Sequence, residues 1–189
     1  RIDEKLLVAL PQGPRDVVRS LHPHGTFNLY LRLWRDASTE GVTASGWRKY
    51  VVFGLSRCSL QCDKFPYPLD DIRGTVELQD DVWTFRDDLI GSNDTGRISC
   101  QGHFIPTPTG QELFLRFIGV NVPLEEELRD ALPVSARQMW LDMKPRGTVH
   151  LEVSVRYRTE TKSQTVLVHA EPVGDTVSIE PAAFPYRLE

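Results

Sequence analysis

The sequence predicts an all-β fold, mostly an antiparallel sandwich, with one short helix. Two observations predict it. Several segments alternate apolar and polar residues, which is the two-residue period of a strand with one buried face, and turn-forming Pro and Gly residues stand between them. The 189 residues, 40% hydrophobic and 25% charged, are expected to form a single domain. Residues 1–20 and 160–189 are expected to be extensions packed on the sandwich.

The clearest alternation lies between Thr148 and Tyr157. There Leu151, Val153 and Val155 fall on one side, so we expect all three in the core. Other segments with strand patterns are 27–33, 50–55, 75–79, 97–105, 112–118, 165–169 and 176–179.

Two connections have recognisable patterns. The turn-rich segment Pro106–Gly110 is typical of a hairpin loop. The segment Leu124–Ala131 follows a proline and begins with acidic residues, which predicts a short helix. The run Glu125–Glu127 is interpreted as a solvated helix face.

Composition excludes several classes of function. A net charge of −4 gives no basic surface for nucleic acid. Motifs of nucleophilic hydrolases, zinc proteases and P-loop enzymes are absent, so no enzyme is expected. Three cysteines, Cys58, Cys62 and Cys100, suit free thiols in a cytoplasmic protein. The chain starts without Met, which suggests a piece of a larger protein.

Paired aspartates bracket the segment that follows the strand pattern at 75–79. Asp80 and Asp81 precede it, and Asp87 and Asp88 close it. Carboxylates at both ends of one loop could converge on a hard cation. Calcium takes six to eight oxygens, so further loops would have to meet there. The alternative is an ordinary acidic surface loop.

The segment Asp80–Gly91 resembles the third calcium loop of C2 domains, which are β-sandwich modules that bind phospholipid and calcium. Asp80 and Asp88 match two aspartates of the family pattern, while Val82 stands where a third is usual. The strand at 26–33 and the loop that holds Asp36 are similar to the family's first strand and first loop. Residues 140–147 are similar to its final hairpin.

This resemblance implies a non-catalytic binding module that docks on a phospholipid membrane surface or on a protein partner. The contacts would come from loops at one end of the sandwich, with peripheral membrane attachment. Asp36, Asp80 and Asp88 are the implied metal ligands, and the missing carboxylate at Val82 implies weak calcium binding and no other cofactor. Aromatic residues beside an arginine suit the boundary between apolar and anionic layers. The candidates for contact with lipid or partner are therefore Trp34, Trp47, Arg48 and Trp83.

Two alternatives remain open. One is a jelly-roll structural subunit of an assembly, such as a viral capsid protein, which is compatible with the β-rich pattern and the long connections. Its partners would be further copies of the chain, through self-assembly. An accessory or scaffold domain without a site of its own would also fit.

Overall fold

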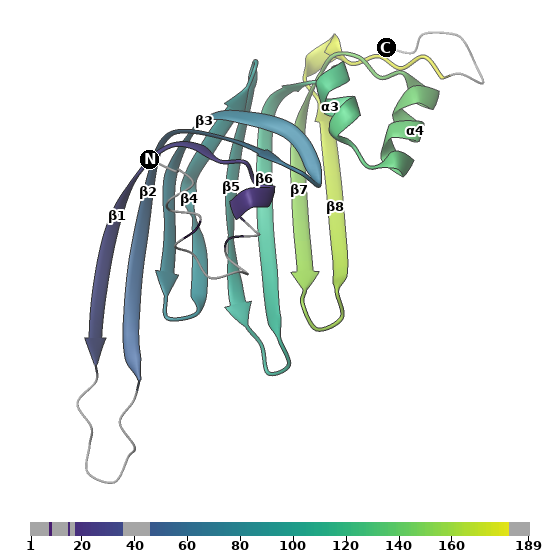
Figure 1. Ribbon diagram of the computed structural model, residues 1–189. Coiled ribbons are helices and arrows are strands. Elements are labelled where there is room, and N and C mark those ends of the chain that lie inside the picture. Colours follow the sequence, from purple (N-terminus) through teal and green to yellow (C-terminus); the bar gives the residue numbers. More distant parts are fainter. Residues whose placement is uncertain (1–7, 9–14, 16–17, 36–45, 182–189) are drawn as a thin grey trace.

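The computed structural model describes residues 8, 15, 18–35 and 46–181, in which eight strands form one antiparallel sheet. Strands adjacent in the chain are adjacent in the sheet, from β1 to β8 (Figure 1). The strands are β1 His24–Arg35, β2 Trp47–Cys62, β3 Phe65–Gln79, β4 Val82–Asn93, β5 Gly96–Pro106, β6 Gln111–Pro123, β7 Thr148–Arg158 and β8 Ser163–Pro172. The helices that lie wholly in the described residues are α3 Glu126–Ala131, α4 Val134–Met143 and the single turn η1 Gly174–Thr176, and residues 18–20 are also helical.

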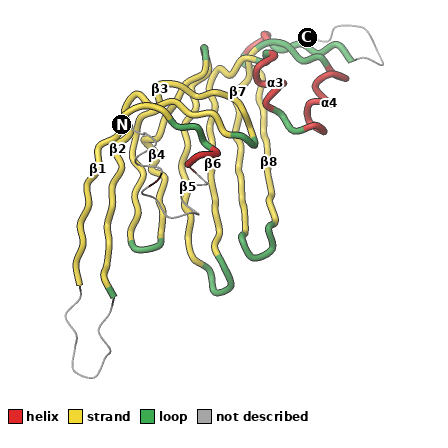
Figure 2. The backbone as a smooth tube through the Cα atoms, in the orientation of Figure 1, coloured by secondary structure: helices red, strands yellow, loops and turns green. Residues whose placement is uncertain are grey.

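The predicted all-β, antiparallel class is confirmed. The described strands make one sheet in simple up-and-down order, and no second sheet or Greek-key crossover occurs among them. Figure 2 shows how little of the described chain is helical. No helix in the described part of the chain is long and apolar enough to span a membrane.

Several predicted elements are confirmed. The alternating segments 27–33 and 148–157 lie in β1 and β7. The hairpin loop at 106–110 is closed by a hydrogen bond of 2.9 Å from the Thr107 amide to the Gly110 carbonyl. The helix expected after Pro123 is α3.

Three segments differ from the prediction. The segment 176–179, expected as a strand, holds the end of the turn η1 and an isolated bridge between Ser178 and Arg146. The acidic segment 80–91 is a two-residue turn at Asp80 and Asp81 followed by strand β4, since its pairing with β3 and β5 overrides its loop-like composition. The segment expected as a final hairpin begins inside helix α4. That helix has no buried residue, so it carries no apolar stripe that a sequence pattern could reveal.

The buried core lies at one end of the sheet. Tyr67 of β3 packs there with Val122 of β6, Val149 of β7 and Leu128 of α3. Because β3 is not a neighbour of β6 or β7 in the sheet, the sheet must curl to bring these residues together. Irregular register in β2 and β3 accompanies the curl, and Figure 1 shows both strands bending across the upper end.

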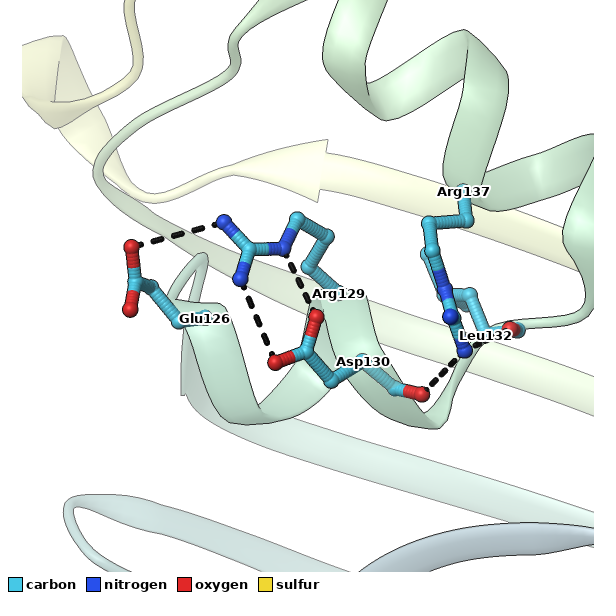
Figure 3. A network of polar contacts seen from close by, with 5 residues as sticks. All are labelled: Glu126, Arg129, Asp130, Leu132 and Arg137. Carbon is cyan, nitrogen blue, oxygen red and sulfur yellow. Dashed lines mark hydrogen bonds and ion pairs between the residues drawn. The ribbon is translucent and has the colours of Figure 1, made fainter.

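One arginine joins the two helices at this end, and a second forms ion pairs within α3 (Figure 3). Arg137 of α4 donates hydrogen bonds to the carbonyls of Asp130 and Leu132 at the end of α3. A cation suits this place, because the last carbonyls of a helix lack partners within it. Arg129 pairs with Asp130 at 2.9 Å and with Glu126 at 3.4 Å.

Candidate functional site

The strand register places a continuous apolar surface on one face of the sheet, which we call the apolar face. In antiparallel pairs, directly opposed residues project to the same face. One row of opposed residues crosses all eight strands and consists of Leu29, Phe53, Val76, Phe85, Gly102, Leu115, Val155 and Val166. A parallel row adds Leu31, Val51, Leu78, Trp83, Phe104, Leu113 and Tyr157.

The apolar face is exposed at its two edge strands and half-buried between them. Leu29 and Leu31 in β1 are 56% and 53% exposed, and Val168 in β8 is 65% exposed. The predicted alternation of β7 is present, but the expected burial is wrong, since Val153 and Val155 are only half-buried. The physical reason is the single sheet, because no second layer among the described residues covers this face. Only its curled end, near Ile98 and Leu151, packs against the core.

The opposite face of the sheet is polar. Ion pairs join neighbouring strands across it, including Arg116 with Glu152 at 2.9 Å and Arg158 with Glu112 at 2.8 Å. Hydrogen bonds from these guanidinium groups lower the pKa of each carboxyl below its usual range. A solvated face of this kind needs no cover, so the two faces differ in what they can bind.

The aspartates predicted as metal ligands do not form a common site among the described residues. Asp36 falls outside the described residues. The Asp80 carboxylate accepts hydrogen bonds from the Lys49 amide at 3.0 Å and the Arg48 Nε at 2.8 Å, and these lower its pKa. The Asp88 carboxylate accepts from the Thr75 amide and hydroxyl at 2.9 and 2.8 Å. In the described part of the chain, neither aspartate belongs to a group of three possible metal ligands.

The predicted contact residues divide between the two faces. Trp34 lies on the polar face, where the Arg48 guanidinium stands 5.8 Å from its ring centre. Trp83 lies on the apolar face and stacks on Phe53, with ring centres 6.0 Å apart. Trp47, at the start of β2, is 72% exposed. Trp83 is thus the one of the four that joins the apolar face in mid-sheet.

A carboxylate cluster that the sequence did not predict lies at the curled end of the sheet. Ligand oxygens of Asp94, Glu125 and Glu127 all lie within 4.8 Å of one another. Burial, together with the charges of Asp94 and Glu127, raises the pKa of Glu125. Burial and the same three carboxylates raise the pKa of Tyr67 to about 12.

The interpretation of the run Glu125–Glu127 as a solvated helix face holds for Glu126 and Glu127, which are both exposed, while Glu125 at the N-cap of α3 is half-buried. Glu125 and Glu127 turn to Asp94, in the turn between β4 and β5. Nothing in the local sequence links residues this far apart, so only the curled fold could reveal the cluster.

Comparison with known proteins gives no relative: no protein-family model, no curated protein and no solved structure matches the chain. The apolar face and the carboxylate cluster are the features of the described chain that bear on its function.

Proposed function

We propose that this chain is a non-catalytic lipid-binding module that holds lipid hydrocarbon chains against the apolar face of its curled sheet. The observation that supports this proposal is the run of apolar residues across all eight strands, which is exposed in β1 and β8 and half-buried between them. Removing apolar surface from water is worth roughly 25 cal/mol per Å². A large exposed apolar patch on a folded protein therefore usually marks a binding surface.

The chemistry of the face favours hydrocarbon over protein. Apart from the outer edges of β1 and β8, the strands are paired with their neighbours, and the rows that cross the sheet carry aliphatic and aromatic side chains. Protein interfaces usually supply about one hydrogen bond per 100–200 Å², which these rows cannot offer. An alkyl chain requires none.

The dimensions of the face also suit an acyl chain. From Phe27 to Leu33 the apolar side of β1 runs about 20 Å, at about 3.3 Å per residue. A bilayer core of about 30 Å contains two acyl layers, so one chain spans about 15 Å. A single acyl chain therefore fits along the strands.

Polar residues occur on this face at the end away from the core. The register places Lys49, Gln111 and Gln164 there, in β2, β6 and β8. The other end is filled by Tyr67, Val122 and Leu128. A lipid would enter with its tails toward the core and keep its headgroup beside the polar rim.

The proposal keeps phospholipid as the partner that the C2 resemblance implies, but assigns the contact to the sheet face in place of the loops. Peripheral attachment to a membrane would accompany the loading of lipid. The main rival occupant is a second copy of the chain, whose apolar face would complete a sandwich.

The test uses two adjacent residues of β1. Leu31 lies on the apolar face and Tyr30 on the polar face, and they are 53% and 56% exposed. We expect Leu31→Asp to weaken binding of a fluorescent phospholipid and Tyr30→Asp to leave it unchanged. Both variants are checked for folding by circular dichroism.

Two results would contradict the proposal. One is a wild-type protein that takes up no phospholipid from vesicles by native mass spectrometry. The other is equal lipid binding by both variants. A lipid-free dimer in light scattering that Leu31→Asp converts to a monomer would assign the face to a second copy.

A further inference from the structure

Three carboxylates from two distant segments meet where the sheet curls. Asp94 comes from the turn between β4 and β5, while Glu125 and Glu127 come from the start of α3. Their oxygens lie within 4.8 Å of one another. Among the described residues, no Lys, Arg or His forms an ion pair with any of the three. Their mutual repulsion is therefore not offset by a side-chain cation of the described chain.

Buried polar atoms beside the carboxylates also lack partners. Asn93 is 7% exposed, and its amide nitrogen donates to Glu127 at 3.1 Å and to the Pro68 carbonyl at 2.9 Å. The amide oxygen of Asn93, the Tyr67 hydroxyl and one oxygen of Glu125 are buried without a hydrogen-bond partner. Buried polar atoms are almost always paired, and each exception requires an explanation.

We propose that Asp94, Glu125 and Glu127 bind a calcium ion beside the buried Tyr67 hydroxyl and the Asn93 side chain. Bound calcium supplies a partner for the buried Glu125 oxygen and the missing positive charge for the three carboxylates. This site is separate from the apolar face and from the aspartates that the C2 resemblance implies.

The donor set and its spacing favour calcium. Every donor is an oxygen, which hard cations prefer. Calcium–oxygen distances of about 2.3–2.6 Å allow two ligands to be up to about 5.2 Å apart, so oxygens within 4.8 Å can share one ion. Magnesium, at about 2.0–2.1 Å, limits opposed ligands to about 4.2 Å and demands stricter octahedral geometry.

The position of the site gives the ion a structural role. It would join the β4–β5 turn to α3 beside Tyr67, which packs with Val122 and Val149 in the core. A ligand that binds only the folded chain stabilises it by RT ln(1 + [L]/Kd). Calcium would thus stabilise the curled end of the sheet, where the apolar face ends.

The experiment is calcium titration of the EDTA-treated chain by calorimetry, with melting curves in parallel. Asp94→Asn and Glu125→Gln each remove one ligand charge, and Asp94 is exposed, so the fold should tolerate its change. Glu126→Gln is the matched control, because Glu126 belongs to the same acidic run but pairs with Arg129 (Figure 3).

We expect the wild type to bind one calcium ion per chain and to melt higher with calcium than with equal magnesium. Asp94→Asn and Glu125→Gln should lose roughly tenfold or more in calcium affinity, and Glu126→Gln should match the wild type. Absence of calcium binding at millimolar concentration would overturn the site. Equal loss in Glu126→Gln and Asp94→Asn, or tighter binding of magnesium, would overturn the assignment.

Discussion

Leu167 and Val168 are neighbours in β8 and almost equally exposed, at 68% and 65%, yet they project from opposite faces of the sheet. Val168 is paired with Val153 on the apolar face, and Leu167 is paired with Ser154 on the polar face. Exposure alone does not separate the two residues. Their register does, and it makes them a matched pair for testing the apolar face.

A charge on the apolar face should reduce the binding of an apolar dye. We expect Val168→Asp to lower the fluorescence of ANS bound to the lipid-free protein, while Leu167→Asp leaves it near the wild-type level. The reason is that only Val168 adjoins the continuous apolar rows. Equal fluorescence in the two variants would mean that the dye does not bind this face.

Removing apolar side-chain volume should destabilise the protein at the curled end of the sheet. The same kind of change should have little effect on stability at the exposed edge. Val122 is 1% exposed, so Val122→Ala should lower the free energy of unfolding by about 2 kcal/mol. Val166 is 48% exposed, so Val166→Ala should cost under about 0.5 kcal/mol. Urea denaturation measures both. Similar costs would show that the core extends across the sheet.

Two glycines at adjacent register positions should respond differently to a methyl group. Gly74 has φ +129°, and a Cβ there would lie 2.5 Å from the Asp88 carbonyl oxygen, so Gly74→Ala should destabilise by about 2–4 kcal/mol. Gly54 pairs with Thr75, and a Cβ there would make only an ordinary contact of 3.9 Å with the Asn28 Cβ, so Gly54→Ala should be neutral or stabilising by up to about 1 kcal/mol. Thermal melting of both variants checks this. A tolerated Gly74→Ala would contradict the bend in β3.

Asp80 should contribute to acid sensitivity. Hydrogen bonds from the Lys49 amide and from Arg48 hold its folded pKa below the unfolded value of 3.8. Its stabilising contribution is therefore present above pH about 4 and is lost as pH falls through the lowered pKa. Asp80→Asn should have a lower free energy of unfolding at neutral pH than the wild type. Below pH 4 its free energy of unfolding, measured by urea denaturation, should depend less on pH. Asp81→Asn, at a side chain 75% exposed, is the control and should keep the wild-type slope.

The Cys100 thiol should resist alkylation. Burial raises its pKa from 9.0 to about 12, so the reactive thiolate at pH 8 is about a thousandfold scarcer than at an unperturbed thiol. Iodoacetamide followed by peptide mass spectrometry should modify Cys100 in the native chain far more slowly than in urea. Comparable rates would show that this part of the sheet opens readily.

Local sequence determined which residues share a face. The alternation around Leu29 in β1 and Val153 in β7 is a property of consecutive residues, because successive side chains of a strand point to opposite sides. The loop at 106–110 and helix α3 were predictable for the same reason, since turns and helix starts depend on neighbouring residues.

Tertiary structure decided what meets those faces. An alternating strand has the same pattern whether a second sheet, a lipid or water lies against it, so the pattern predicted burial of Val153 that the single sheet does not provide. The acidic segment at 80–91 pairs as a strand because β3 and β5 lie on either side of it. Asp94 and Glu125 come together because the sheet curls, and that long-range packing has no trace in either local segment.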